Sequence, residues 1–425
     1  MNIKNLFEDY TKLPRSMFIL FFAQIVSSAG NFVFPFLAIF FTKTLVFNEQ
    51  KAGFYVMLAT AAKVPGLLLG GKLSDVFGRK KIFIIFSTLS ALFIFFCLLV
   101  GQIGQDEIIP WLLVLSAVFN GANYPAMKAM VADLTNPDNR KAAFSLLYLG
   151  MNIGFAVGPL IAGLLYNNYL KLLFVGDTAT TLISVALVYF LISETLPGPN
   201  NLGKSGTADY NSERAEEGSI YRVLLSRPYL LIFTLIFTLY SFIYVQSEFT
   251  LPLQMINIFG DNGPQYFGTI MTLNGVVVIF FTVIIISVTR RIEPILNVSL
   301  AGILYALGFG VIYFSTNLPL FALSTILWTL GEIIASTYSD VYIINHTPIT
   351  HRGRFSAIIH ILIGSGFIFG PYLSGLFITY YKLENIWLFV FTVAIFSSFL
   401  MYLLNYFENR AKLSAMLSEQ IEEEI

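Results

Sequence analysis

Two of the acidic residues in the long apolar stretches of this sequence stand out, Glu248 in the seventh stretch and Glu332 in the tenth. Tyr240 and Tyr244 precede Glu248 at intervals of four residues, and Trp328 precedes Glu332 by four. A helix would therefore place an aromatic ring on the same face as each acid. A carboxylate among apolar groups is costly to ionise and can exchange a proton near neutral pH. The pattern predicts two proton-coupling residues, Glu332 as the principal one and Glu248 as the secondary one.

Uncharged polar residues recur at helical spacing in the first and fourth apolar stretches. With the aromatic residues beside the two acids, they predict a central amphipathic cavity that binds a small molecule. The predicted substrate-binding residues are Gln24, Asn31, Asn120, Asn123, Tyr240, Tyr244 and Trp328. A single polar residue in a membrane helix more often bonds a neighbouring helix, and that alternative stays open for each of them. For Glu248, contact with water near the outer membrane surface is the alternative.

The composition indicates that these residues are positioned by membrane-spanning helices. Hydrophobic residues make up 56% of the chain and charged residues only 12%, against about 25% charged in ordinary soluble domains. About twenty apolar residues cross a hydrocarbon core of ~30 Å as a helix. The sequence predicts an all-α membrane protein with twelve transmembrane helices. The predicted spans are 16–42, 52–71, 82–101, 110–133, 141–166, 172–193, 228–253, 265–289, 295–315, 318–344, 355–380 and 385–407.

Several classes of function are disfavoured by what the sequence contains. The net charge is zero and no basic patch suggests a nucleic-acid partner. There is no ATP-binding Walker loop, and one cysteine and three histidines do not provide metal-ligand spacing. The sequence predicts no enzyme, no catalytic residue, no metal and no cofactor. The energy for any uphill process is therefore expected to come from an ion gradient.

Lys and Arg residues are concentrated in alternate loops, which predicts that both termini lie in the cytoplasm. A polar linker separates two sets of six spans, so the predicted parts are an N-terminal half 1–193, a cytoplasmic linker 194–227, a C-terminal half 228–408 and a tail 409–425. Gly154, Gly158-Pro159 and Gly163 recur at a constant offset as Gly366, Gly370-Pro371 and Gly375. This predicts a parallel repeat of the two halves. The glycines favour helices that slide, with tight static packing as the alternative.

The loop between the second and third spans reads Gly71-Lys72-Leu73-Ser74-Asp75-Val76-Phe77-Gly78-Arg79-Lys80-Lys81. It resembles the helix 2/3 loop of the major facilitator superfamily, G-x-L-[SA]-D-x-x-G-R-[RK]-[RK], and lacks only the usual basic residue at Val76. The resemblance implies a gating latch, in which Asp75 contacts the cytoplasmic end of helix 11 and Arg79 contacts Asp133. The residues implied in gating are Gly71, Asp75, Gly78, Arg79, Lys80, Asp133, Arg140, Gly154, Gly158 and Pro159.

A narrower resemblance, to multidrug/proton antiporters of the LmrP type, rests on three short segments. These are Thr329-Leu330-Gly331-Glu332-Ile333, Glu248 before Leu251-Pro252-Leu253, and Asp133 before Asn136 and Asn139-Arg140-Lys141. The sequence departs from the drug-antiporter pattern at Ala117-Val118-Phe119-Asn120-Gly121, where Arg-x-x-Gln-Gly is common, and at Leu147, where an aspartate is expected.

The resemblance implies a monomeric secondary transporter in the plasma membrane, with the lipid bilayer, protons and a small-molecule substrate as its partners. Its implied activity is efflux of amphipathic compounds in exchange for protons. The alternative within the superfamily is a facilitator or symporter for a metabolite or lipid. An alternative from another class is a membrane-embedded enzyme or sensor.

Lys63, Lys128 and Asp177 also lie inside apolar stretches. We expect Lys63 to pair with an acid or to extend toward the membrane surface, and Lys128 to extend toward that surface. Asp177 is close to the predicted outer end of the sixth span, and we expect it to be solvated.

Overall fold

The computed structural model of the chain describes residues 10–102, 104, 106–136, 139–196, 227–346 and 352–423, without the side chains of 352–358 and 412–423. The regular structure of these residues is helical, with no strand among them. Most of the predicted linker, at 197–226, lies outside the described residues.

Eleven helical segments of the described chain are long and apolar enough to cross a membrane. One of them, Pro228–Thr289, has 62 residues, which at 1.5 Å per residue is about 93 Å and several times the ~30 Å of a hydrocarbon core. It is interrupted by 3₁₀ turns at η4 (Val245–Ser247) and η5 (Gly260–Asn262) and supplies the seventh and eighth crossings. The predicted all-α fold with twelve transmembrane helices is confirmed.

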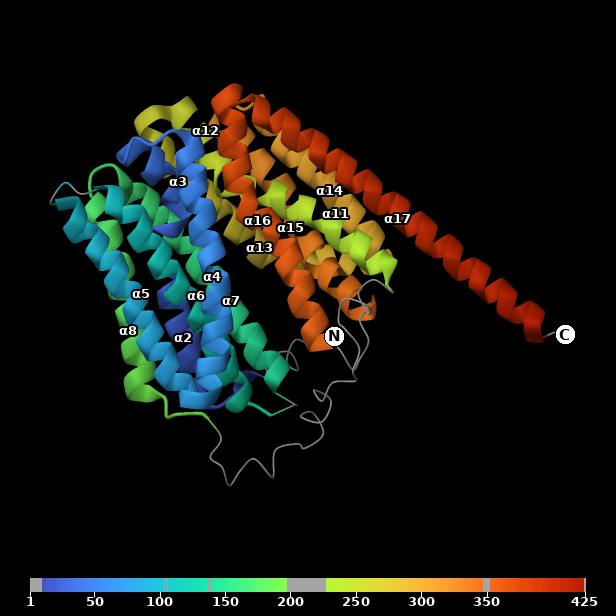
Figure 1. Ribbon diagram of the computed structural model, residues 1–425, viewed down its shortest axis with the longest axis horizontal. Coiled ribbons are helices and arrows are strands. Elements are labelled where there is room, and N and C mark those ends of the chain that lie inside the picture. Colours follow the sequence, from blue (N-terminus) through green and yellow to red (C-terminus); the bar gives the residue numbers. More distant parts are fainter. Residues whose placement is uncertain are drawn as a thin grey trace. The chain divides into compact units, whose positions relative to one another are not determined.

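Packing divides the chain into two compact units. The first holds the described residues up to 196 together with 247–279 and 371–380. In this unit α4, α5 and α6 lie side by side, and α2 packs against α7 and α8 (Figure 1). Its helical segments up to α8 are α2 (Arg15–Ala29), η1 (Phe34–Phe36), α3 (Leu37–Ile39), η2 (Phe40–Thr44), α4 (Glu49–Phe77), α5 (Arg79–Gln102), η3 (Asp106–Ile108), α6 (Ile109–Asp133), α7 (Arg140–Tyr166) and α8 (Leu170–Leu191).

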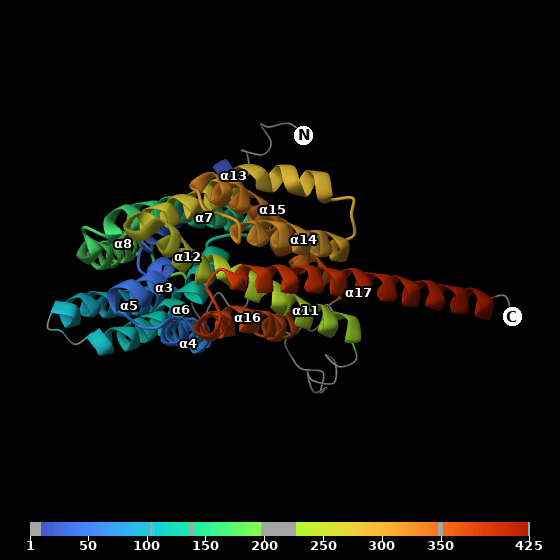
Figure 2. The same cartoon turned by 90° about the horizontal axis from the view of Figure 1, so that it is seen from above.

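The second unit holds the described residues of 227–246, 280–370 and 381–423. Within it α14 packs against both α15 and α17 (Figure 2). The last helix continues to Glu423, so the part of the predicted tail at 409–423 is helical. The segments from 228 onward are α11 (Pro228–Tyr244), η4, α12 (Thr250–Phe259), η5, α13 (Gly263–Thr289), α14 (Pro294–Ile312), α15 (Leu318–His346), α16 (Arg352–Tyr380) and α17 (Asn385–Glu423).

The first predicted span, 16–42, is a broken helix rather than a continuous one. Helix α2 ends at Ala29, and helical turns resume only at Phe34. Pro35 has no N–H to pair with the carbonyl of Asn31, four residues earlier. The proline therefore favours an interruption at the residues around Asn31.

A buried carboxylate of α8 stabilises this interruption. Asp177 accepts hydrogen bonds from the backbone N–H groups of Phe32 at 3.1 Å and Val33 at 3.2 Å. Asp177 is only 4% exposed. The expectation that it is solvated was wrong, because its Oδ2 atom accepts the Val33 N–H and shares the Phe32 N–H with the carbonyl of Gly30.

The seventh span is interrupted in the same way. Helix α11 ends at Tyr244, and Glu248 lies in a turn before α12. Pro252 cannot donate to the carbonyl of Glu248, again four residues earlier. The prediction that Tyr240, Tyr244 and Glu248 lie on one face of a continuous helix was therefore wrong for Glu248.

The glycine repeat is also a repeat of packing contacts. On α7 and α16 the first two glycines of each set pack against a broken span, and the third packs against the first residues of another helix. The pairs are Gly154 with Ser28, Gly158 with Ala29 and Gly163 with Pro264 on α7, and Gly366 with Thr238, Gly370 with Val245 and Gly375 with Glu49 on α16. A side chain at most of these positions would meet backbone atoms, so the glycines permit close helix contact.

Candidate functional site

Three cavities have predicted site residues in their walls. Two of these cavities lie in the first unit and one lies in the second. We name them the asparagine cavity, with a volume of about 360 Å³, the Lys63–Glu248 cavity, of about 140 Å³, and the Glu332 cavity, of about 240 Å³. Each is described within its own unit.

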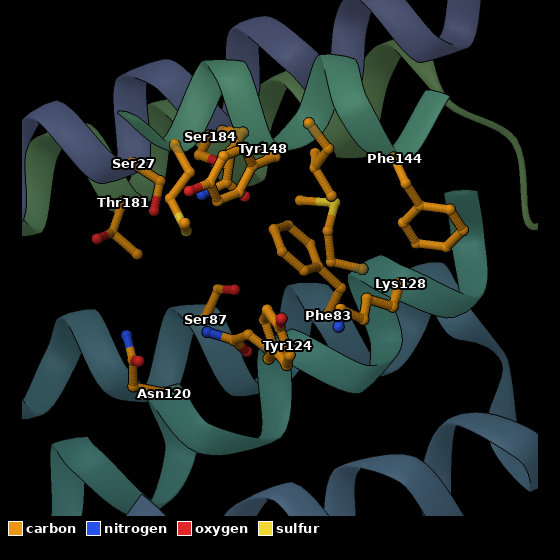
Figure 3. Close-up of a pocket in the computed structure, with 15 residues that line it drawn as sticks. Ser27, Phe83, Ser87, Asn120, Tyr124, Lys128, Phe144, Tyr148, Thr181 and Ser184 are labelled. Atoms are coloured by element: carbon orange, nitrogen blue, oxygen red, sulfur yellow. The ribbon is translucent and has the colours of Figure 1, made fainter. Parts of the chain in front are cut away.

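The asparagine cavity collects Gln24, Asn120 and Asn123, three of the predicted substrate-binding residues. Figure 3 shows Asn120 and Tyr124 on one wall, opposite a wall with Ser27, Thr181 and Tyr148. The Asn123 Oδ1 atom is buried without a hydrogen-bond partner among the described residues. Lys128 also lines this cavity, with its ammonium 4.3 Å from the centre of the Tyr124 ring.

The Lys63–Glu248 cavity joins both broken spans to the middle of α4. Asn31 enters it from the first break and Glu248 from the second, and Lys63 is the middle residue of α4. The Lys63 ammonium lies 5.2 Å from the centre of the Phe34 ring. The charges of Lys63 and Glu248 attract each other across the cavity. Both residues keep solvent-accessible surface there.

The Glu332 cavity contains one acid among aromatic rings. Glu332 is the middle residue of α15 and accepts a hydrogen bond of 2.9 Å from the Tyr244 hydroxyl. Tyr240 lines the same cavity but donates its hydroxyl to the carbonyl of Val298 at 2.8 Å. The walls also include Phe237, Tyr305, Ala335, Ser336, Ile363 and Phe367.

The structure thus distributes six of the seven predicted substrate-binding residues over three cavities, and Trp328 lines none of them. Trp328 is fully buried, with its ring 5.9 Å from that of Tyr244 and stacked on Phe309 at 5.5 Å. Lys63 was absent from the predicted site, although a basic residue in the middle of an apolar stretch is a functional candidate in its own right. Pairing with an acid was one of the two expected outcomes for Lys63. Glu248 lines the same cavity without a salt bridge to Lys63, and the sequence did not identify this acid.

The glycine turn between α4 and α5 is shorter than expected. Helix α4 continues through Asp75 to Phe77, and Gly78 alone forms the turn, with a positive φ of 109°. A residue with a side chain would be strained there. Gly71 makes only ordinary contact with Pro125, whereas its neighbour Gly70 packs against the backbone of Ala122.

The predicted contact of Arg79 with helix 4 is present. Its Nε atom lies 3.3 Å from Oδ2 of Asp133, and its guanidinium also pairs with Asp75. The contact of Asp75 with the end of helix 11 stays a prediction. On α7, Arg140 donates to the carbonyls of Ala132 and Thr135 near the C-terminal end of α6.

The prediction missed Glu194, which caps the start of α5. Its carboxylate accepts the backbone N–H groups of Lys80 at 3.2 Å and Lys81 at 3.3 Å, and those of Thr195 and Leu196. Partial burial opposes ionisation, but these four hydrogen bonds outweigh it and lower the pKa of Glu194. Lys80 also donates its Nζ to the carbonyl of Tyr189 at 2.8 Å. Glu194 therefore ties the end of the sixth span to the helix 2/3 turn.

The three cavities contain groups that can bind organic molecules and exchange protons. Among the described residues, no group of three or more His, Cys, Asp and Glu side chains could hold a metal ion. The combination of membrane helices, polar cavities and charged side chains at helix midpoints is typical of a transport site.

Comparison with known proteins agrees with this interpretation. The sequence profile described as Major Facilitator Superfamily matches residues 20–348. The chain is 25% identical over 355 residues to the uncharacterized MFS-type transporter YqjV of Bacillus subtilis, covering 82% of each chain. It is 22% identical over 349 residues to a Na⁺, Li⁺, K⁺/H⁺ antiporter of Planococcus maritimus, covering 76% of this chain and 80% of that one.

Among solved structures, the peptide transporter POT in complex with sulfate matches with a TM-score of 0.75 at 16% identity. The match covers 93% of this chain and 95% of that chain and shows similarity of fold. The profile covers well over half of the sequence. This multi-pass membrane protein therefore belongs to the major facilitator superfamily.

Proposed function

We propose that this membrane transporter exports amphipathic organic compounds in exchange for protons, by alternating access. Glu332 is the principal coupling residue and Glu248 the secondary one. The protein acts as a monomer in a bacterial plasma membrane, with both termini in the cytoplasm.

The observation that carries this proposal is the setting of Glu332. Its carboxylate lies in the middle of α15, in a cavity where five of the ten lining residues are aromatic, and Tyr244 donates a hydrogen bond to it. Aromatic walls bind apolar ring systems, and a carboxylate attracts a cationic group. A proton and a cationic amphiphile would compete for this one charge, and such competition produces exchange. The cation/proton antiporter relative supports the use of a proton gradient.

The gating residues contribute to the proposal through the turn around Gly78. Arg79 joins Asp75 to Asp133, and Glu194 fastens the start of α5 to the end of the sixth span. We propose that this cluster acts as a latch that biases the conformational equilibrium. In that role it would alter the flux while the affinity of the cavities stays unchanged.

The experiment is uphill transport of ethidium in proteoliposomes with an imposed pH gradient. Glu332→Gln should abolish accumulation against a gradient while retaining downhill exchange, because glutamine keeps the shape of the side chain and cannot exchange the proton. Glu107→Gln, a change of the same type at an exposed acid, serves as the matched control. Accumulation by Glu332→Gln with wild-type pH dependence would contradict the assignment and direct attention to Asp340 and His360, which lie 3.8 Å apart.

The alternative is a facilitator or symporter for a metabolite or lipid. A facilitator would equilibrate its substrate without responding to the pH gradient. A proton symporter would respond with the opposite sign. The direction of the imposed gradient in the same vesicles therefore distinguishes all three mechanisms.

A further inference from the structure

The Lys63–Glu248 cavity has a feature that the proposed exchange at Glu332 does not use, which is a lysine at the midpoint of a membrane helix. Lys63 is the middle residue of the 29-residue helix α4, which places it about 21 Å from either end at 1.5 Å per residue. A charge at this depth is costly to maintain and indicates a function.

The polar groups of this cavity are available to a ligand. The Asn31 amide, the Lys63 ammonium and the Glu248 carboxylate make no hydrogen bond or salt bridge with other described residues. Lys63 and Glu248 are the charged residues that line the cavity, and the elements around them contribute apolar groups such as Phe155, Phe267 and Met271. Glu248 thus balances the charge of Lys63 without occupying its donors.

The two helix breaks explain why these groups meet. Asn31 precedes Pro35 by four residues and Glu248 precedes Pro252 by four, in the first and the seventh spans. Both residues therefore lie where a proline interrupts the helix, and both line the same cavity. Paired interruptions at corresponding positions of two repeated halves mark binding sites in transporters.

We propose that the Lys63–Glu248 cavity binds the anionic group of an aromatic carboxylate or sulfonate, so that the substrate class includes anionic and zwitterionic amphiphiles. Lys63 and the Asn31 amide donate to the anion, and the Phe34 ring packs against the ring of the ligand. The volume of about 140 Å³ is close to that of a cavity that accepts one benzene ring.

Glu248 determines how many protons the cavity takes up when it binds the anion. An anion bound at Lys63 leaves the cavity with one surplus negative charge while Glu248 is ionised. Uptake of one proton by Glu248 restores neutrality, so one proton is bound with each anion. The inference rests on the proposed function for its role in transport, but binding itself requires neither flux nor a proton gradient.

The test is fluorine NMR of 4-fluorobenzenesulfonate with the purified full-length protein. Line broadening that excess benzenesulfonate reverses reports binding, and the sulfonate stays ionised throughout the pH range. Equal concentrations of 4-fluorobenzenesulfonamide and 4-fluorobenzylammonium serve as neutral and cationic probes. The sulfonate should bind more tightly than both, and more tightly as the pH falls.

Lys63→Gln should weaken sulfonate binding by about tenfold or more, the usual cost of losing a charge-assisted hydrogen bond. Glu248→Gln should keep the binding and abolish its pH dependence. Lys51→Gln, which removes a lysine over the ring of Phe47, is the matched control. Because Lys63→Gln leaves an unbalanced carboxylate and is at risk of misfolding, the neutral double variant Lys63→Gln/Glu248→Gln is tested too and should also fail to bind.

Wild-type affinity in either variant that lacks Lys63, or equal affinity for the neutral and cationic probes, would overturn the inference. Loss of uphill ethidium flux in Glu332→Gln with no sulfonate binding at Lys63 would leave the proposed function standing and remove only this site. Sulfonate binding together with pH-independent ethidium flux would support this site and contradict the proposed exchange for protons.

Discussion

The Lys63–Glu248 cavity and the Glu332 cavity place charge at the middle of a helix in two different ways. In the first, a lysine on the unbroken helix α4 lies near an acid from an interrupted span. In the second, a single acid on the unbroken helix α15 is bound by a tyrosine hydroxyl. The first cavity can stay neutral while both of its groups are ionised, whereas the second becomes neutral only when its acid is protonated or a cation binds.

This difference indicates a division of roles. An acid in a cavity that no basic residue lines is suited to competition between a proton and a cation. An acid beside a lysine is suited to joint binding of a proton and an anion. The two cavities also differ in the continuity of their helices. Interrupted spans contribute to the Lys63–Glu248 cavity, whereas the helix that carries Glu332 is continuous.

The largest expected effect comes from removing the carboxylate that holds the first break. Asp177→Ala removes the acceptor of the Val33 N–H and one of the two acceptors of the Phe32 N–H, which also donates to the carbonyl of Gly30 at 2.8 Å. This should lower the free energy of unfolding by about 1–3 kcal/mol and weaken sulfonate binding, because the break positions Asn31. The measurement is unfolding in detergent together with the NMR titration.

Asp177→Asn keeps one acceptor oxygen, so its free energy of unfolding should lie between those of Asp177→Ala and the wild type. Wild-type stability of Asp177→Ala would show that the break needs no such support.

The next largest effect concerns the balance of charge in the Lys63–Glu248 cavity, which the Glu332 cavity lacks. Lys63→Gln should destabilise the protein by about 1–2 kcal/mol, a buried-pair penalty reduced by the solvent access of this cavity. The double variant Lys63→Gln/Glu248→Gln should recover most of that loss. Glu332→Gln should not destabilise the protein in this way, because no basic residue lines the Glu332 cavity. Thermal unfolding of the four proteins measures this, and additive losses in the double variant would refute the charge-balance argument.

A smaller effect concerns the hydrogen bond that holds Glu332. Tyr244→Phe removes the donor at 2.9 Å and keeps the ring. We expect the KM for ethidium to change by about three- to tenfold, since a hydrogen bond to a charged group contributes about 1.5–3 kcal/mol in a desolvated site and less in an open cavity. Sulfonate binding should be unaffected. Tyr240→Phe, which loses the bond to the carbonyl of Val298 and leaves the bond to Glu332 in place, is the control, and an equal change in both variants would count against a specific role for Tyr244.

The smallest effect is expected at Glu194, which lies outside both cavities. The pKa of Glu194 is lowered from 4.5, so the folded state favours its ionised form. Its contribution to stability is complete above about pH 4.5 and is lost as the pH falls through the lower folded-state pKa. Glu194→Gln should lower Tm by about 1–2 °C at neutral pH, with no difference from the wild type at the acid end. A constant difference in Tm at every pH would exclude the charge as its source.

The apolar stretches were sufficient to predict the twelve-helix fold, because a lipid environment requires each crossing to satisfy its own backbone hydrogen bonds. The loop from Gly71 to Lys81 indicated the superfamily, and the spacing of Trp328 and Glu332 placed one acid beside an aromatic ring. These features are local in sequence. They could be predicted because helical periodicity relates residues three or four positions apart.

The tertiary structure decided what depends on residues far apart in the chain. Helical periodicity extended Tyr240 and Tyr244 to Glu248, but Pro252 interrupts that helix and Glu248 instead enters a cavity with Lys63, from a different span. Asp177 was expected to be solvated because it is near the predicted membrane surface, yet it accepts the backbone N–H groups of Phe32 and Val33 at the break of the first span. The sequence contains the prolines, lysine and acids, but only the packing of distant helices determines which of them share a cavity.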